Sequence, residues 1–321
     1  MYSRIQGTGS CLPDRVVTND DLSLRMDTSD EWIRVRTGVR ERHIAEPEQT
    51  TCDLAETAAR RALEASGVSA AELSMIVMAT TTPDLVFPNT ACLLQERLEA
   101  PGCAAFDLQA ACSGFTYGLS IADKFVREGG NGPALVVGAE TLSRMVDWED
   151  RATAVLFGDG AGAVVLGASE EPGMLCSRLH ADGAYKHLAW TDVGVSKGFT
   201  DGPNGGIAIK LRGTELFKFA VRKFEELAKE TLEAAGLGLE EVDWFIPHQA
   251  NERITRAVAS ALGLPDERVI STIARHANTS AATIPLALDE WVRADRIERG
   301  DLILMEAFGS GATWGSALLR Y

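Results

Sequence analysis

The amino-acid sequence predicts an α/β fold built from two similar halves. Three observations support this prediction. The segment at residues 62–77 recurs at residues 231–246, the segment at 134–140 recurs at 302–308, and helix-like and strand-like stretches alternate within each half. The two matches have nearly the same offset, which favours duplication over chance. Alternation of this kind is typical of layered α/β proteins, and we expect largely parallel strands in each half.

The first repeat predicts a helix that ends at a glycine and is followed by a buried strand. Gly67 stands between a helix-like stretch and the apolar run 75–77, and Gly236 has the same place in the second half. Glycine often ends a helix because it adopts the left-handed conformation without steric cost. Short continuous apolar runs indicate strands buried on both faces. We expect one half to span residues 1–170 and the other residues 171–321.

The composition is that of a globular protein large enough for a substantial core. The chain has 321 residues, of which 45% are apolar and 24% are charged. No apolar run approaches the roughly 20 residues that a membrane-spanning helix needs, and the first residues lack the features of a secretion signal. We therefore expect a cytoplasmic protein without a membrane segment. The formal net charge of −15 argues against nucleic-acid binding, which needs a basic surface, but it leaves room for local basic patches.

The cysteines do not have the spacing of a disulfide framework or of a metal site. No two of them form a Cys-X-X-Cys pair, and together with the five histidines they show no ligand spacing for zinc. We therefore expect no metal. The ordinary role of a lone cysteine is that of a small buried hydrophobic residue, and one of the six departs from it. The six are Cys11, Cys52, Cys92, Cys103, Cys112 and Cys176.

Cys112 has the surroundings of a catalytic nucleophile. A strand-like stretch ends near Leu108, small residues follow, and a helix-like segment begins at Phe115. This order predicts that Cys112 lies at or near a helix N-terminus, where free N–H groups favour the thiolate over the thiol. Its small neighbours permit a tight turn and the close approach of a substrate. A buried structural cysteine is the alternative, and the local sequence alone favours neither.

Two further polar residues are candidates for the same site, because ligands of α/β sheets gather at the carboxyl ends of strands. His248 follows an apolar run and Pro247, and a histidine in this place can donate to a reacting carbonyl or move a proton. An ordinary loop histidine is the alternative. Asn278 lies among small residues in a segment that the duplication places opposite Cys112. Its alternative role is that of a helix cap.

A glycine-rich loop at residues 306–315 lies between two apolar runs near the end of the chain. Such a loop can aim backbone N–H groups at a developing oxyanion. It can equally be a flexible hairpin turn, and the local sequence leaves both interpretations open.

Taken together, these motifs resemble the β-ketoacyl-acyl carrier protein synthase III family, condensing enzymes of the thiolase superfamily. The resemblance covers nearly the whole chain, and the ordered set of motifs is far more specific than any one of them. It implies a thiolase-like five-layered α-β-α-β-α fold from two duplicated halves, usually in a homodimer. The motifs are residues 30–38, residues 111–115 around the nucleophile, residues 154–162, 248–251 and 278–282, and the loop around Phe308.

The resemblance implies a two-step reaction that begins a fatty acid. Cys112 takes an acyl group from acyl-CoA, by default acetyl-CoA, and malonyl-acyl carrier protein then loses carbon dioxide and attacks the acyl-cysteine. A thiolate suits both steps because it attacks a thioester and later leaves it. His248 and Asn278 are expected to stabilise the enolate, and the backbone N–H groups of Cys112 and Ser310 to hold the acyl oxyanion. Acyl-CoA is a substrate in this scheme, so no cofactor is expected.

The resemblance also carries binding residues over to this chain. It implies that Trp32 and Arg151 lie around the adenine of CoA, where an aromatic face and a guanidinium group can hold a base between them. A helix surface with an apolar anchor is the alternative for these residues. Phe308 and Phe87 are expected to border the acyl pocket, Phe87 that of the partner subunit. The implied CoA-binding set is Thr28, Trp32, Arg36, Arg151 and Asn251.

An acyl carrier protein is acidic, so an enzyme with a net charge of −15 must offer it a local basic face. Basic residues recur at helical spacing between positions 218 and 223, and two arginines follow the His248 loop. We expect these residues to form the docking surface, although each one can also lie on a solvated helix face. They are Lys218, Arg222, Lys223, Arg253 and Arg256.

Two positions depart from the pattern of the family and bear on the primer. Ala277 stands where the family often has glycine, and Ser310 replaces the middle glycine of the C-terminal loop. Both changes can reshape the acyl pocket. A related condensing enzyme that uses a medium-chain, branched or aromatic acyl-CoA starter in secondary metabolism is therefore the alternative.

Other classes of protein fit the sequence less well. A degradative thiolase needs a second catalytic cysteine in the C-terminal loop, and residues 305–321 contain none. A non-catalytic partner subunit typically lacks the nucleophile, whereas Cys112 is present. A cysteine hydrolase shares the pairing of cysteine with histidine, but it would release free acid without a malonyl partner.

Overall fold

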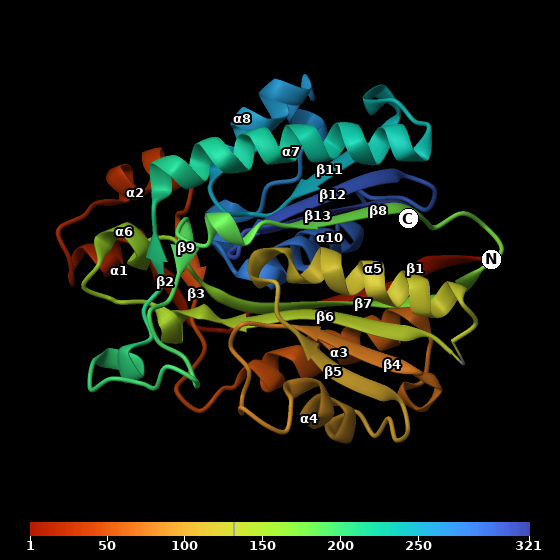
Figure 1. Cartoon of the computed structure of the whole chain (residues 1–321), viewed down its shortest axis with the longest axis horizontal. Coiled ribbons are helices and arrows are strands. Elements are labelled where there is room, and N and C mark those ends of the chain that lie inside the picture. Colours follow the sequence, from red (N-terminus) through yellow and green to blue (C-terminus); the bar gives the residue numbers. More distant parts are fainter. Residues whose placement is uncertain (131) are drawn as a thin grey trace.

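Five layers stack in the computed structural model, which describes residues 1–130 and 132–321 (Figure 1). They are α3 with α4, a first sheet, α5 with α10, a second sheet, and α7 with α8. The predicted five-layered fold is therefore confirmed. The helices of these layers are α3 (Thr51–Ser66), α4 (Thr90–Arg97), α5 (Gly114–Arg127), α7 (Gly213–Ala235), α8 (Glu252–Leu262) and α10 (Thr283–Arg293).

Both sheets are mixed, in the part of the chain that the structure describes. The first has the strand order β1-β7-β6-β4-β5 and the second β11-β12-β13-β8. Only β4 with β5, β4 with β6, and β11 with β12 are parallel, so the expectation of largely parallel strands is wrong. A parallel pair needs a long crossover, whereas residues 310–312 alone join β12 to β13 and force them antiparallel. The strands are β1 (Tyr2–Cys11), β4 (Met75–Ala79), β5 (Ala104–Leu108), β6 (Ala134–Thr141), β7 (Asp159–Ser169), β8 (Met174–Ala181), β11 (Trp244–Pro247), β12 (Leu302–Gly309) and β13 (Thr313–Arg320).

The two halves repeat the same local structure at the predicted offset. In each half a helix ends at a glycine in the left-handed conformation, Gly67 with φ of 70° and Gly236 with φ of 69°, before a buried strand. The turns η2 (Ala111–Ser113) and η8 (Ser280–Ala282) are also equivalent, and each begins with a non-glycine residue at positive φ. β7 ends at Ser169 and β8 begins at Met174, and we propose the boundary between the halves in this connection.

Smaller elements form a lobe at one end of the layers, on the left of Figure 1. The fully buried Arg42 holds this lobe together, because its guanidinium group donates to the Val17 carbonyl at 3.0 Å and to Asn19 Oδ1 at 2.8 Å. Burial lowers the pKa of Arg42 to about 10, which leaves it charged at neutral pH. The elements are β2 (Val16–Thr18), α1 (Asn19–Ser23), α2 (Asp30–Thr37), β3 (Glu41–His43), α6 (Arg151–Ala154), β9 (Ala189–Trp190), β10 (Lys210–Leu211) and α9 (Ile273–His276).

The apolar core is divided by the sheets. One cluster lies between the two sheets around α5 and α10 and includes Phe115, Leu119 and Ile284. A second lies between α3 and the first sheet, and a third between α7 and the second sheet. Among the described residues, no helix is both long and apolar enough to cross a membrane, and no group of acidic, histidine or cysteine side chains is arranged to hold a metal. All six cysteines, which lie within the described residues, are unpaired.

Candidate active site

The three residues that the sequence suggests as catalytic line one cavity of about 1420 Å³. Cys112 comes from the first half, and His248 and Asn278 come from the second. Ser310 and Phe308, at the end of β12, lie on the same wall. The fold therefore brings together side chains that are up to about two thirds of the chain apart in sequence.

Cys112 lies in a tight turn directly before α5. Ala111, with φ of 46°, is in a conformation that costs a non-glycine residue about 1 kcal/mol or more, so the surrounding contacts must hold it. Thr313 Oγ1 supplies one such contact, because it donates to the Ala110 carbonyl at 2.9 Å. The prediction that Cys112 lies near a helix N-terminus is confirmed.

The thiol of Cys112 is protonated at neutral pH in this state of the protein. Burial raises its pKa to about 11, against a hydrogen bond from Ser280 that lowers it. Desolvation therefore works against the thiolate, and the expectation that the helix end favours it stays a prediction.

His248 follows β11 and is held by its backbone and by one ring nitrogen. Its N–H donates to the Glu306 carbonyl at 2.7 Å, and Nδ1 lies 2.7 Å from Thr283 Oγ1. Burial lowers the pKa of His248 to about 3, so the ring is neutral at physiological pH. The Thr283 hydroxyl has one proton and two acceptors in reach, His248 Nδ1 and the Ser280 carbonyl at 3.0 Å. Its orientation therefore decides which nitrogen of His248 carries the proton.

Asn278 has a structural contact and a free donor at the same time. Its backbone pairs with residues 156–158, since Asn278 N–H donates to the Leu156 carbonyl at 2.9 Å and the Asn278 carbonyl accepts from Gly158 at 3.1 Å. Its side-chain oxygen accepts from the Ser280 N–H at 2.9 Å, as in an Asx-turn. This bond gives Asn278 a cap-like role, and its role as a donor to a ligand stays a prediction.

The glycine-rich loop is packed directly against the nucleophile turn. A Cβ atom at Gly309 would lie 2.6 Å from the Ala110 carbonyl oxygen and 2.9 Å from the Cys112 nitrogen, so only glycine fits there. The Ser310 hydroxyl donates to the Ala189 carbonyl, which ties the loop to β9. The loop is the hairpin between β12 and β13 and lies beside Cys112, and its role toward an oxyanion stays a prediction.

The residues expected to bind CoA gather around Trp32. The guanidinium carbons of Arg36 and Arg151 lie 4.4 Å and 4.5 Å from the centre of its ring. Asn251 Nδ2 donates to the Arg36 carbonyl at 3.0 Å, and these two residues and Trp32 line the cavity. Thr28 and Arg151 do not line it. A base held between Trp32 and Arg151 needs a separation of about 7 Å, so Arg151 must move away from the ring to admit one.

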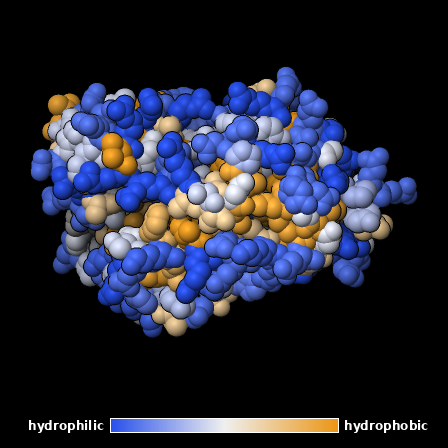
Figure 2. Space-filling view, turned by 90° about the horizontal axis from the view of Figure 1, so that it is seen from above, coloured by the Kyte–Doolittle hydropathy of each residue, from blue (hydrophilic) through white to orange (hydrophobic). Residues whose placement is uncertain are grey.

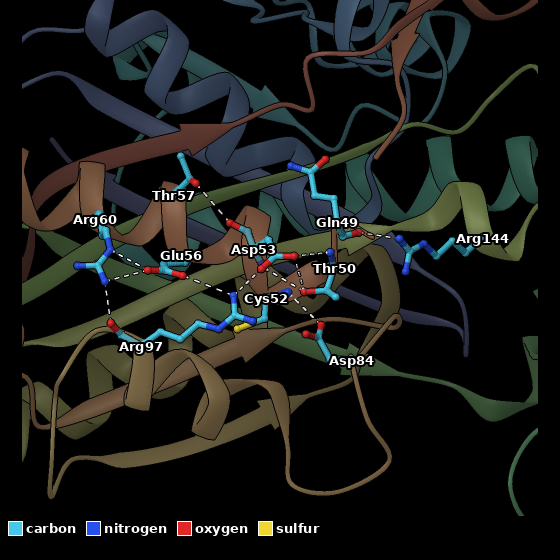
Figure 3. A network of polar contacts seen from close by, with 10 residues as sticks. All are labelled: Gln49, Thr50, Cys52, Asp53, Glu56, Thr57, Arg60, Asp84, Arg97 and Arg144. Atoms are coloured by element: carbon cyan, nitrogen blue, oxygen red, sulfur yellow. Dashed lines mark hydrogen bonds and ion pairs between the residues drawn. The ribbon is translucent and has the colours of Figure 1, made fainter. Parts of the chain in front are cut away.

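One wall of the cavity is anchored by a polar network around the start of α3 (Figure 3). Thr50 caps this helix, and its N–H donates to the Asp53 carboxylate at 2.6 Å, which also pairs with Arg97 at 2.6 Å. Asp84 accepts a hydrogen bond from the Cys52 N–H at 3.0 Å, and this bond fixes the loop between β4 and α4. At the tip of that loop Phe87 is 83% exposed and does not line the cavity of its own chain.

The basic residues expected to dock a carrier protein differ in their availability. Lys223 lies between Phe219 and Trp314 and pairs with Glu226 at 2.6 Å. Arg222 pairs with the same glutamate, and Arg256 pairs with Glu252 at 3.0 Å. Lys218 and Arg253 are exposed, line the mouth of the cavity, and have no acidic partner among the described residues.

Sequence reasoning missed the polar residues behind the three candidates. Ser280 belongs to the motif at residues 278–282, which was recognised without a role for this serine. Thr283, whose hydroxyl lies 2.7 Å from His248 Nδ1, is the residue after that motif. Glu140 ends a strand of the internal repeat, and its burial gave no signal in the sequence. Their importance depends on contacts between the halves, which no local pattern reveals.

The five-layered fold and the side chains on this cavity place the chain among condensing enzymes with the thiolase fold. Models described as 3-oxoacyl-[acyl-carrier-protein (ACP)] synthase III and as its C-terminal part match residues 106–183 and 232–321. The chain belongs to this family of condensing acyltransferases.

Relatives and solved structures agree with this assignment over the whole length of the chain. β-Ketoacyl-[acyl-carrier-protein] synthase III of Xanthomonas campestris pv. campestris is 61% identical over 321 residues, which are 100% of this chain and 99% of that protein. The structure of 3-oxoacyl-[acyl-carrier-protein] synthase III from Aquifex aeolicus VF5 is similar with a TM-score of 0.94 and 51% identity, covering 99% of this chain and 100% of that one. The priming β-ketosynthase from the R1128 polyketide biosynthetic pathway has a TM-score of 0.95 and 38% identity, covering 99% and 96%.

Proposed function

We propose that this chain joins an acyl-CoA primer to malonyl-acyl carrier protein by decarboxylative condensation, and so initiates fatty-acid synthesis. One observation carries the proposal: Cys112, His248 and Asn278 line a single cavity in a chain that belongs to the synthase III family. Both substrates are thioesters of the cytoplasm, where we place the reaction, and acyl-CoA is consumed as a substrate rather than held as a cofactor.

The experiment that tests this function is incubation with a panel of acyl-CoAs, with and without malonyl-acyl carrier protein, followed by intact mass. We expect an acyl adduct on the protein with acyl-CoA alone, and its transfer to the carrier protein when the malonyl substrate is added. Release of free acid at the same rate without the malonyl substrate would favour a cysteine hydrolase instead.

In the first step, the Cys112 sulfur attacks the thioester carbonyl and CoA leaves. The negative charge on the carbonyl oxygen needs donors that are in place before the reaction. The backbone N–H groups of Cys112 and Ser310 are our candidates, because the close packing of Gly309 against Cys112 keeps the two segments together. Ser310 acts through its backbone, so its side chain is compatible with this role.

In the second step, His248 and Asn278 stabilise the enolate formed when the malonyl group loses carbon dioxide. The Asn278 NH₂ group and a proton on His248 Nε2 are the donors. For Nε2 to carry the proton, Thr283 must donate to Nδ1, which lies 2.7 Å from its Oγ1, rather than to the Ser280 carbonyl at 3.0 Å. A neutral imidazole is suited to donate without giving up its proton, and the pKa of about 3 keeps it neutral.

Stacking on Trp32 is our explanation for recognition of the CoA adenine. We expect Trp32→Ala to raise KM for acyl-CoA about tenfold and to leave kcat nearly unchanged, since a stacked cation–π contact contributes roughly 0.5–2 kcal/mol. Initial-rate kinetics measure this. The same acyl group on pantetheine, which lacks the adenine, is the control substrate and should lose nothing. An equal loss with both substrates would contradict the assignment.

The carrier protein docks at the mouth of the cavity, in our proposal, with Lys218 and Arg253 as the main contacts. Both line that mouth without an acidic partner among the described residues, whereas Arg222, Lys223 and Arg256 are partly neutralised by neighbouring glutamates. Figure 2 looks onto the face that carries α7 and α8, and it shows an apolar band bordered by hydrophilic side chains.

We expect Arg253→Glu to raise KM for malonyl-acyl carrier protein at least tenfold at low salt, because it places a negative charge against an acidic partner. The effect should shrink as salt rises to about 0.5 M. The matched control is Lys229→Glu on the same face, about 16 Å farther along α7 than Lys218. Unchanged carrier-protein kinetics for Arg253→Glu at low salt would contradict the docking surface.

The exposure of Phe87 is our reason for proposing that the protein is a homodimer. An aromatic side chain that is 83% exposed, next to the exposed Val86, is unfavourable in water and fits an interface between copies of this chain. Phe87 then borders the partner's acyl pocket, while Phe308 borders its own. Sedimentation of the protein and of Phe87→Glu tests the dimer.

The primer is the part of the proposal with an open alternative. Similarity at 38% identity to a priming β-ketosynthase of a polyketide pathway is a specific observation in favour of a starter other than acetyl-CoA. An adduct with longer, branched or aromatic acyl-CoA but none with acetyl-CoA would favour that alternative and leave the reaction class intact.

A further inference from the structure

Two hydroxyl groups lie where the nucleophile turn η2 meets the hairpin between β12 and β13. The hydroxyl of Thr313, the first residue of β13, donates to the Ala110 carbonyl at 2.9 Å and lies 3.2 Å from the Ser310 carbonyl. The Ser113 hydroxyl lies 2.8 Å from Thr313 Oγ1 and 2.8 Å from the Ala110 carbonyl oxygen. These contacts connect the turn that carries the nucleophile to the hairpin beside it.

The number of protons and lone pairs fixes how these groups pair. The Ala110 carbonyl oxygen has two lone pairs, and the Ser113 N–H uses one of them at 3.2 Å. With the Thr313 hydroxyl on the second, the proton of the Ser113 hydroxyl goes to Thr313 Oγ1, which accepts from no other donor of the described residues. Each proton is then used once, and the chain from Ser113 through Thr313 to Ala110 crosses from the turn to the hairpin and back.

The two hydroxyl groups lie behind the cavity wall and not on it. Ser113 is fully buried, and within the part of the chain that the structure describes neither Ser113 nor Thr313 lines the cavity. Cys112 and Ser310, on either side of the contact, do line it. Thr313 therefore acts on a substrate only through the backbone segments that it holds.

The proposed oxyanion donors need such a connection because they come from two segments. The Cys112 N–H belongs to the turn and the Ser310 N–H to the hairpin, and no backbone hydrogen bond between described residues joins the two directly. Two N–H groups aimed at one point repel each other while no anion lies between them. A Cβ atom on Gly309 would lie 2.9 Å from the Cys112 nitrogen, so the segments cannot come closer. The hydroxyl chain prevents them from moving apart.

We propose that Thr313, together with Ser113, is a positioning residue that fixes the spacing of the two oxyanion donors. The proposal rests on the proposed function, in which the N–H groups of Cys112 and Ser310 hold the acyl oxyanion. In acylation the sulfur–carbon bond forms as a carbonyl electron pair moves onto oxygen. That pair returns as the bond to the CoA sulfur breaks, and the thiol proton ends on CoA.

A loosened hairpin slows both steps of the reaction, because the same acyl oxygen becomes negative again when the malonyl carbon attacks the acyl-cysteine. His248 and Asn278 differ from Thr313 in this respect, since they are assigned to the enolate of the second step alone. The ratio of the losses in the two steps therefore distinguishes the two kinds of residue.

The experiment compares Thr313→Val, which exchanges the hydroxyl for a methyl group, with Thr313→Ser, which keeps the hydroxyl, in the full-length protein. Rapid quench with intact mass measures acylation of Cys112 by the acyl-CoA that labels the wild type, and single-turnover transfer from preloaded protein measures the second step. We expect Thr313→Val to slow both steps by at least about tenfold, because a misplaced donor forfeits part of the roughly 10²–10³-fold that one oxyanion donor contributes. KM for acyl-CoA should not change, and Thr313→Ser should react close to the wild-type rate.

Thr231→Val is the matched control for the loss of a buried hydroxyl. Thr231 is fully buried, and its hydroxyl lies 2.6 Å from the hydroxyl of Ser316 on the same strand, β13, as Thr313. Both steps should keep their wild-type rates in this variant. Ser113→Ala should slow both steps less than Thr313→Val does, and the double variant should be no slower than Thr313→Val. Melting temperatures identify a misfolded Thr313→Val, and Ser113→Ala then carries the test.

Two small reagents separate an effect on the oxyanion from an effect on the sulfur. Iodoacetamide alkylates Cys112 by displacing iodide, so no oxyanion forms, whereas p-nitrophenyl acetate acylates it through an oxyanion and needs no recognition of CoA. We expect Thr313→Val to be alkylated at the wild-type rate and to be acylated by the ester at least about tenfold more slowly. Cys112→Ala is the background for the other cysteines in both assays.

Acylation of Thr313→Val at the wild-type rate would overturn the proposal. Equal losses in acylation and alkylation would also overturn it, because they would show that the sulfur itself has moved, and so would a Thr313→Ser variant as slow as Thr313→Val. Failure of the proposed function looks different. In that case no acyl-CoA labels the wild type at Cys112, while acylation by the ester still decides whether Thr313 positions the donors.

Discussion

Cys112→Ala is expected to lose condensing activity by about 10⁴-fold or more, because no other cysteine lines the cavity among the described residues. The acyl adduct seen by intact mass after incubation with acyl-CoA should disappear. Cys176→Ala, at another half-buried cysteine, is the control and should keep both the adduct and the activity. An adduct that forms on Cys112→Ala at the wild-type rate would show that the mechanism is wrong.

The same experiment distinguishes the nucleophile from a structural cysteine. Cys112 lies at a strained turn whose geometry depends on Ala111 and on contacts to Ala110, not on the sulfur. We therefore expect Cys112→Ala to fold with a melting temperature close to that of the wild type. A large loss of stability together with loss of activity would instead indicate that Cys112 is a buried structural cysteine.

His248→Ala and Asn278→Ala are expected to separate the two steps of the reaction, acylation of Cys112 and transfer of the acyl group. Each should still form the acyl adduct, but transfer from the adduct to malonyl-acyl carrier protein should fall about 10²–10³-fold, the usual cost of removing one donor to a developing oxyanion. Single-turnover transfer from preloaded protein measures this. His187→Ala, at an exposed histidine, is the matched control. Equal losses in adduct formation and transfer would contradict the assignment of these donors to the second step.

The pH dependence of the transfer step follows from the pKa of His248. Since burial lowers this pKa to about 3, the neutral ring is present throughout pH 5–8, and the transfer rate of preloaded protein should show no inflection near 6.5. The neutral form is lost only as the pH falls toward 3. A transfer rate that halves near pH 6.5 would show that His248 titrates normally in the acyl-enzyme.

Much of the fold could be predicted because the signals are local. Gly67 and Gly236 end their helices through a backbone conformation that is intrinsic to glycine, and short apolar runs mark strands wherever they lie. Strand direction was predicted wrongly, because it depends on whether the chain crosses the sheet or returns beside the same strand. The loop at residues 310–312 returns the chain beside the strand that it leaves, and the antiparallel pairing of β12 with β13 shows this.

The site shows the same division between local and tertiary information. The sequence by itself determined which residues are candidates, since Cys112, His248 and Asn278 each stand at a turn that its neighbours define. Only the tertiary structure decided their chemical state. The pKa of Cys112 is raised and that of His248 is lowered because atoms from both halves exclude water around them. This desolvation, and the packing of the turn η8 against the turn η2, arise from segments that are distant in the chain, and so no local pattern contains them.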